Sequence, residues 1–270
     1  MFTTIITDCK DDNARGRQQT RIESLTGHPV AFVGVDSDLE AGMQLIDMLD
    51  ACEGRRGLIL VNVAPRGGHT RKWENGTPFA YFTVGETLIV SSVDGFALSG
   101  IKKFGLTDKV QLLDTRTATE ALKVAGVIDE TVAAYIPETQ FRSFDFTPRV
   151  GAFLFQGGTL KSQDYPLSEV IDLPKAIWHI DSFGNCKTTL TPEDIITDGL
   201  TETRFGSLPY VPQLRDLPDS DTALVRGSSG LASTRLLEIM SQRISFAEHH
   251  EVSIGDDIFE DKSYFSKATN

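Results

Sequence analysis

The sequence of 270 residues is poor in positive charge and in cysteine, and it contains no long apolar run. Its 26 Lys and Arg residues stand against 38 Asp and Glu residues, which gives a formal net charge of −12. This excess of negative charge repels nucleic acid and anionic membranes at long range, so we expect neither as a partner. A membrane-spanning helix needs about 20 apolar residues in succession, and the sequence offers no such run.

The three cysteines, Cys9, Cys52 and Cys186, are far apart and form no pair with the spacing of a zinc site or a redox dithiol. The first residues lack the basic start and apolar run of a signal peptide. We therefore expect a cytoplasmic protein. The neighbouring His249 and His250 have no cysteine or carboxylate at metal-ligand spacing, so no metal is expected. The common glycine-rich nucleotide-binding motifs are missing from the sequence.

The first half of the chain alternates β-type and helical patterns. Strands are predicted at 2–7, 30–35 and 58–63, the last as a continuous apolar run that suits a strand buried on both faces. Ser37 and Glu40 match a capping box at the start of a helix. Further strands are predicted at 79–84, 88–93 and 110–113, and helices from a capping box at Thr117 and over 148–155. This order predicts a three-layer α/β domain over residues 1–165, with a mostly parallel sheet.

The pattern changes in the second half. Residues 162–174 are polar and bounded by prolines, which is typical of a linker. Strands are predicted at 176–180 and 223–226, a short helix at Thr191-Pro192, and an extended loop over the proline-rich residues 206–220. The prediction for residues 166–270 is a smaller, mostly antiparallel β domain.

Asp8 follows the first predicted strand, where open α/β sheets place their ligand-binding residues. A carboxylate at this position can accept both hydroxyls of a ribose, although a turn or helix-capping aspartate fits the position equally well. Residues 64–71 follow the buried third strand and contain two glycines, Arg66, His69 and Arg71. This composition indicates a loop that approaches a ligand.

Residues 179–189 place Asp181, Phe183 and Asn185 around one glycine. One interpretation is a binding loop in which Asp181 accepts from an ammonium, Asn185 contacts a flat heterocycle and Phe183 adds apolar surface. A plain hairpin turn has the same composition. Ser228 and Ser229, between two glycines, are candidates for binding a carboxylate, or else part of a flexible turn.

In their order along the chain, these segments resemble the family of S-adenosyl-L-methionine (SAM) hydroxide adenosyltransferases, which also contains fluorinating and chlorinating adenosyl enzymes. Residues 179–189 are close to the family's Ile-Asp-x-Phe-Gly-Asn-x-x-Thr-Asn. Thr7-Asp8 with Asp12 and Gly16 resembles its opening Thr-Asp-Phe-Gly-x-x-Asp-x-x-x-Gly, shortened by one residue and without Phe-Gly. Weaker matches are residues 37–41, 64–71, 92–95, 141–145, 228–230, 237–239 and 255–256.

The resemblance implies a homotrimer that binds SAM or adenosine at its subunit interfaces, with SAM as substrate or ligand and no further cofactor. It implies that Asp8 holds the ribose diol, and that Asp181 and Ser228, with Ser229 beside it, hold the amino and carboxyl ends of methionine. Asn185 and the backbone around Arg243 would contact adenine. The implied reaction is displacement at the ribose 5′ carbon by water, which gives adenosine and methionine.

The sequence departs from the family at the residues that act on the nucleophile. Hydrolytic members use an Asp, an Arg and a His; here Arg71 keeps the arginine, while Ala64 and Arg142 stand at the other two positions. Ser143 falls where halogenating members carry a halide-contacting serine, and His69 is a candidate replacement base. Three hypotheses stay open: a divergent hydrolase, a halogenase-like enzyme, and a silent SAM- or adenosine-binding protein. An unrelated α/β binding module is a fourth.

Overall fold

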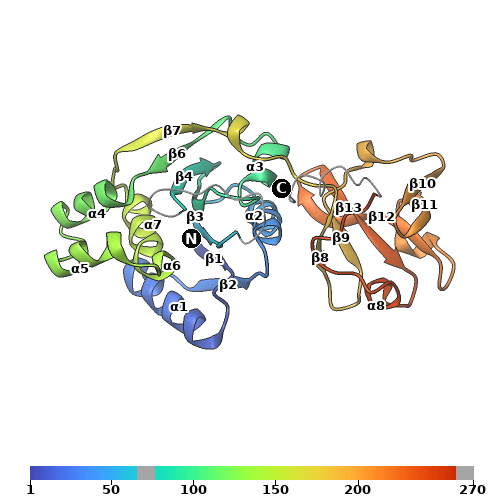
Figure 1. The fold of residues 1–270 in the computed structure, drawn as a ribbon, viewed down its shortest axis with the longest axis horizontal. Helices are drawn as coiled ribbons and strands as arrows, with labels where there is room; N and C mark the ends of the chain where they lie inside the picture. The colour runs from blue at the N-terminus through green and yellow to red at the C-terminus, as the bar shows by residue number, and fades with distance from the viewer. Residues whose placement is uncertain (66–76, 260–270) are drawn as a thin grey trace, which may run out of the picture. The chain divides into compact units, whose positions relative to one another are not determined.

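The computed structural model describes residues 1–65 and 77–259, and the chain divides into two compact units, Met1–Asp172 and Leu173–Asn270 (Figure 1). The division therefore falls later than the expected end of the first domain at residue 165. The reason is that the predicted linker begins with a strand, β7 (Ser162–Pro166), which pairs antiparallel with β6 (Lys109–Leu113). The residues of β7 are mostly polar, so the sequence did not predict this strand.

The first unit contains a seven-stranded sheet in the order β2-β1-β3-β5-β4-β6-β7. Its remaining strands are β1 (Phe2–Thr7), β2 (Val30–Gly34), β3 (Gly57–Asn62), β4 (Phe79–Val84) and β5 (Thr87–Ser92). The pairs β1–β2, β1–β3 and β3–β5 are parallel, and the pairs that involve β4, β6 and β7 are antiparallel. The predicted α/β fold is confirmed, and its first sheet is mixed, with the parallel strands together at one side.

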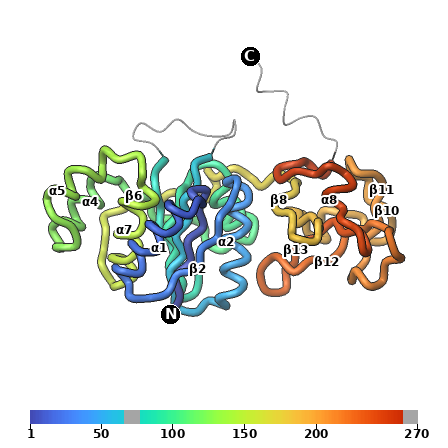
Figure 2. Tube along the Cα trace, turned by 90° about the horizontal axis from the view of Figure 1, so that it is seen from below, coloured from blue at the N-terminus to red at the C-terminus, as the bar shows by residue number. Residues whose placement is uncertain are grey.

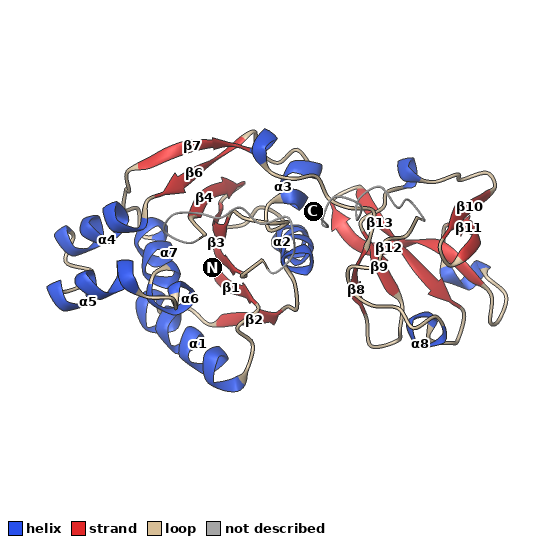
Figure 3. Ribbon diagram, viewed as in Figure 1, coloured by secondary structure: helices blue, strands red, loops and turns tan. Residues whose placement is uncertain are grey.

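Helices cover both faces of this sheet, which makes the three layers (Figures 1 and 3). One face carries α1 (Asp12–Thr26), α4 (Thr115–Val124) and α7 (Thr147–Phe155), whose buried Ile22, Leu122 and Val150 join the core around Ile5 and Leu60. The other face carries α2 (Asp38–Cys52) and α3 (Ser99–Lys103), and α2 contacts β1 and β3. The turned view in Figure 2 also shows α2 beside these strands. Shorter helices are α5 (Glu130–Tyr135), α6 (Arg142–Asp145) and the 3₁₀ turns η1 (Ile136–Glu138) and η2 (Leu167–Glu169).

Helix caps explain where these helices begin. Ser37 caps α2 as predicted, because its hydroxyl accepts from the Glu40 N–H at 3.1 Å. The capping box predicted at Thr117 is wrong: the carboxylate of Asp114 accepts from the Thr117 N–H at 2.8 Å, so α4 starts earlier. Helix α1 was not predicted from the sequence, because it has no apolar stripe and buries only two side chains, Gln18 and Ile22.

The second unit contains a six-stranded sheet in the order β10-β11-β12-β13-β9-β8. Its strands are β8 (Ile177–Ile180), β9 (Cys186–Thr188), β10 (Leu200–Thr203), β11 (Gly206–Val211), β12 (Thr222–Leu231) and β13 (Thr234–Ser241). Every strand pair is antiparallel except β11–β12. Its helical elements are η3 (Pro192–Asp194), η4 (Leu214–Asp216) and α8 (Phe246–His249). The smaller β unit is thus present as expected.

Two details of this unit bear on the sequence predictions. The expected loop over residues 206–220 is wrong in its first part, because β11 occupies it. Pro209 fits this strand since it pairs only with β10, while β12 pairs with the following Tyr210 and Val211. The short helix predicted at Thr191-Pro192 is present as a 3₁₀ turn with a capping box between Thr191 and Asp194. Across the described parts of both units, no helix combines the length and the apolar character needed to cross a membrane.

Candidate functional site

The first unit has a cavity of about 560 Å³ at the edge of the sheet where the parallel strands β1, β3 and β5 end. Residues that end or follow these strands line it, among them Asp8, Ala64 and Ser92. The opposite wall comes from the start of α4 and from residues 137–143. Open α/β sheets bind their ligands at this edge, and the volume is within the range of small-molecule sites.

Asp8 is positioned by a neighbouring strand. The Ala64 N–H, just beyond β3, donates to Asp8 Oδ2 at 3.2 Å, and the Cys9 thiol donates to Oδ1 at 3.7 Å. The helix that follows is capped by Asp11, whose carboxylate accepts from two N–H groups of α1. Asp8 is therefore a residue of the cavity and not the helix cap that its sequence position also allowed.

Arg142 and Ser143 lie in the same cavity as Asp8, although they come from α6. The Arg142 guanidinium donates to the Thr77 carbonyl at 3.1 Å, and its burial lowers its pKa. Cys9 lies in the same cavity. Burial, together with the nearby Asp8, raises the pKa of Cys9, so the thiol stays protonated at neutral pH. The cavity thus combines a carboxylate, a partly desolvated cation and a hydroxyl.

Two other carboxylates of the cavity wall serve the local fold. Asp114 caps α4, and hydrogen bonds from the Thr117 hydroxyl and N–H lower its pKa. Glu138 forms an exposed ion pair with Arg116 at 2.7 Å, which joins η1 to α4. Both groups are held in roles that a ligand would have to disturb.

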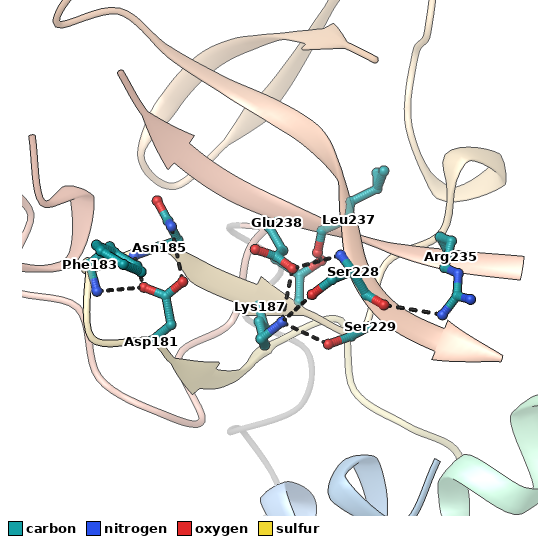
Figure 4. Close-up of polar contacts among 10 residues, drawn as sticks. Asp181, Phe183, Asn185, Lys187, Ser228, Ser229, Arg235, Leu237 and Glu238 are labelled. Atoms are coloured by element: carbon teal, nitrogen blue, oxygen red, sulfur yellow. Dashed lines mark hydrogen bonds and ion pairs between the residues drawn. The ribbon is translucent and has the colours of Figure 1, made fainter. Parts of the chain in front are cut away.

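In the second unit, Asp181, Phe183 and Asn185 form the turn between β8 and β9 (Figure 4). Asp181 accepts from the Phe183 N–H at 2.8 Å, and from the Asn185 N–H and side-chain amide, both at 3.0 Å. Burial acts to raise the pKa of Asp181, but these hydrogen bonds outweigh it and the pKa is lowered. The segment is thus the hairpin turn that the sequence allowed, with Phe183 76% exposed at its tip. Its contact with a ligand stays a prediction.

Ser228 and Ser229 lie on β12, where the Lys187 ammonium donates to both hydroxyls at 3.1 and 2.9 Å (Figure 4). The same ammonium pairs with Glu238 on β13 at 3.0 Å. Neither Lys187 nor Glu238 was singled out in the sequence. Their pairing depends on which residues of β9 and β13 face each other, so no local sequence pattern pointed to them.

The other predicted site residues are separate from these clusters or undescribed. Arg243 is exposed in a left-handed turn with φ 65°, and its guanidinium pairs with Asp219 at 3.2 Å. His250 packs against the Phe246 ring with centroids 4.4 Å apart. Within 1–65 and 77–259, no cluster of three or more His, Cys, Asp or Glu side chains is arranged to hold a metal. His69 and Arg71, with Arg66, lie outside the described residues.

Comparison with solved structures finds the same fold in two bacterial proteins. A conserved uncharacterized protein from Thermotoga maritima aligns with a TM-score of 0.66 and 16% identity, over 94% of this chain and 98% of that one. A conserved hypothetical protein from Thermus thermophilus aligns with a TM-score of 0.62 and 17% identity, over 94% and 97%. No family model and no curated protein matches the sequence. At these identities the likeness extends to the fold alone.

Proposed function

We propose that this chain binds S-adenosyl-L-methionine, with the ribose at Asp8 in the cavity of the first unit. One observation carries the proposal: Asp8, Arg142 and Ser143, chosen from the sequence by their resemblance to adenosyltransferase residues, line one cavity at the ligand-binding edge of the sheet. The resemblance supplies the identity of the ligand. The trimer and the cytoplasmic location expected from the sequence belong to the same proposal.

Asp8 supplies the chemistry that a ribose requires. An ionised carboxylate only accepts hydrogen bonds and has about four acceptor positions on its two oxygens. Two vicinal hydroxyls can therefore donate to one carboxylate, and such charge-assisted bonds are stronger than neutral ones. The Ala64 N–H, which donates to Asp8 Oδ2 at 3.2 Å, fixes the carboxylate at the end of β1 before a ligand arrives. This preorganisation lowers the cost of binding.

The reaction implied by the resemblance is displacement at the ribose 5′ carbon. The nucleophile donates an electron pair to this carbon while the carbon–sulfur bond breaks. The electron pair of the broken bond stays on sulfur, so methionine leaves as a neutral thioether. No proton has to reach the leaving group. When water is the nucleophile, its proton must be accepted by a base, and positioned bases contribute about 10²–10⁴ in rate. Among the described residues, no histidine lines the cavity.

An anionic nucleophile is the second candidate, because it needs no base. The observation in its favour is the position of Arg142 and Ser143, consecutive residues of the cavity wall that offer a positive charge and a hydroxyl donor. The burial that lowers the Arg142 pKa also reduces its hydration, which strengthens its attraction for an anion. A halide held there would be partly desolvated, and desolvation makes a halide a better nucleophile.

The experiment has a binding arm and a product arm. Calorimetric titration with SAM and with adenosine measures binding, and Asp8→Asn is the negative control. Chromatography after incubation with SAM in water, chloride or fluoride then distinguishes adenosine from a 5′-halogenated nucleoside. Binding without either product supports the silent binding protein. Wild-type protein that binds neither ligand contradicts the proposal.

The proposed trimer has its own test. Light scattering during size-exclusion chromatography, with and without SAM, gives the mass of the assembly in solution. We expect the mass of three chains. A monomer in both conditions contradicts this part of the proposal and leaves the test of SAM binding unchanged.

A further inference from the structure

A four-residue cluster in the second unit consists of Lys187, Ser228, Ser229 and Glu238 (Figure 4). The resemblance assigns no role to Lys187 or Glu238. Strand register builds this cluster: Lys187 of β9 lies directly opposite Glu238 of β13, so their side chains share one face of the sheet. The neighbouring β12 brings the two serines to the same ammonium. The cluster therefore joins three strands through one lysine.

A β-bulge explains why the serines reach this lysine. Between Arg226 and Gly230 the pairing of β12 with β13 shifts, because more residues of β12 oppose the short stretch of β13 from Leu237 to Arg235. Gly227, Ser228 and Ser229 lie between these pairs on β12, where β13 has only Leu236. A Cβ atom on Gly227 would collide with the Glu238 carboxylate, so glycine lets this carboxylate approach the backbone. Glu238 Oε1 then accepts from the Ser228 N–H at 3.1 Å.

The Lys187 ammonium occupies one side of the Ser228 hydroxyl. The Lys187 ammonium has three N–H donors and no acceptor, and Ser228, Ser229 and Glu238 are its partners at 2.9–3.1 Å. Because Ser228 Oγ accepts from Lys187, its own O–H hydrogen must point away from the ammonium. Ser228 is exposed, whereas the side chains of Lys187 and Glu238 are only 15% and 3% exposed. A buried ion pair therefore presents an oriented hydroxyl donor at the surface.

We propose that Lys187 is a positioning residue, which makes the Ser228 hydroxyl a donor for the carboxylate of the bound amino acid. This inference rests on the proposed function, in which Ser228 holds the carboxyl end of methionine. Accepting from Lys187 uses one of the two lone pairs of Ser228 Oγ and polarises its O–H as a donor, and the positive charge of Lys187 favours a carboxylate over a second ammonium. Arg235, whose guanidinium donates to the Ser228 carbonyl at 3.1 Å, adds a second positive charge beside the same residue. Lys187 thus determines which end of an amino acid binds here.

The alternative is that the pair of Lys187 and Glu238 only stabilises the sheet. Two ligands distinguish the roles: SAM, and decarboxylated SAM, which has the same adenosyl sulfonium but no carboxylate. In Lys187→Met, a positioning role lowers the affinity for SAM by about tenfold, the effect of one lost charge-assisted hydrogen bond, and leaves the affinity for decarboxylated SAM unchanged. A merely structural role lowers both affinities equally.

Further variants guard against misfolding and test whether Lys187 acts through Ser228. Lys187→Met leaves Glu238 buried without its partner, which is a costly state. The double variant Lys187→Met with Glu238→Gln removes both charges, and its melting temperature reports whether the sheet is intact. Ser228→Ala alone should show the same selective loss for SAM. Combined with Lys187→Met it should cause little additional loss, because the lysine acts through this hydroxyl.

The measurement is calorimetric titration of the full chain and its folded variants with both ligands. We expect a selective loss of SAM binding in both the Lys187→Met/Glu238→Gln double variant and Ser228→Ala. We expect no further loss when Lys187→Met and Ser228→Ala are combined. Equal losses for the two ligands, or additive losses, overturn the role of Lys187 while the proposed function stands. Wild-type protein that binds neither SAM nor adenosine rejects the proposed function itself, and the inference with it.

Discussion

The two candidate regions hold their charged side chains in different ways. In the first unit, Asp8 accepts from a backbone N–H and Arg142 donates to a backbone carbonyl. In the second, Asp181 is bound within its own turn and Lys187 is paired with the Glu238 carboxylate. Main-chain groups of other segments thus help to position Asp8 and Arg142, whereas a hairpin turn positions Asp181 and a facing strand positions Lys187. The first region lines its cavity with charged side chains, and the second presents serine hydroxyls held by Lys187.

The largest effect is expected at Asp8. Asp8→Asn keeps the shape of the side chain but replaces one acceptor oxygen by a donor, so the ribose diol loses charge-assisted bonds of about 1.5–3 kcal/mol each. We expect the affinity for SAM and for adenosine to fall by about 10- to 100-fold in a calorimetric titration. The matched control is Asp164→Asn, an exposed aspartate of β7 that pairs with Lys109. Equal affinities in wild type and Asp8→Asn would remove Asp8 from the site.

The second effect concerns the bulge of β12. Gly227→Ala places a methyl group against the Glu238 carboxylate, and such overpacking costs about 1–3 kcal/mol of unfolding free energy. Chemical denaturation followed by circular dichroism measures the loss. The control is Gly16→Ala in α1, where a Cβ meets nothing within 4 Å. Alanine there should raise stability, since it favours helix more than glycine does. Full stability in Gly227→Ala would show that Glu238 moves away without cost.

A third, smaller effect concerns the wall of the cavity. Asp114→Ala removes the N-cap of α4, the helix that carries Thr115 and Arg116 to the cavity, and lost caps cost about 1 kcal/mol. Urea denaturation should show this loss. Asp108→Ala, at an exposed aspartate whose backbone carbonyl accepts from the Leu167 N–H, should have little effect. Equal stability in the two variants would contradict the capping role of Asp114.

The smallest effect is a pH dependence of stability at Asp181. Its lowered pKa means that the folded state favours the ionised carboxylate. The contribution of ionised Asp181 to the free energy of unfolding is fully present above the pKa of an unfolded aspartate, about 3.9. It is lost as the pH falls through the lower pKa of the folded state. The stability difference between wild type and Asp181→Asn should therefore be constant near neutral pH and shrink below about pH 4. A difference that grows on acidification would reverse the assigned direction.

Features encoded by neighbouring residues were predictable from the sequence, and features encoded by strand register were not. The apolar run of β3 and the Ser37 cap of α2 correctly predicted their elements. The position of Asp8 beside the cavity followed from the predicted strand β1, while its contact with a ligand stays a prediction. Helix α1 was missed, since its face carries little apolar surface. The link between Lys187 and Glu238 depends on which residues of β9 and β13 face each other, and no local pattern contains that information.

The most direct test of the SAM-binding site is a crystal structure of the protein with SAM or adenosine bound. We expect a nucleoside in the cavity of the first unit, with both ribose hydroxyls within hydrogen-bond distance of the Asp8 carboxylate, about 2.6–3.0 Å. A nucleoside bound elsewhere, with Asp8 in contact with neither hydroxyl, would contradict it.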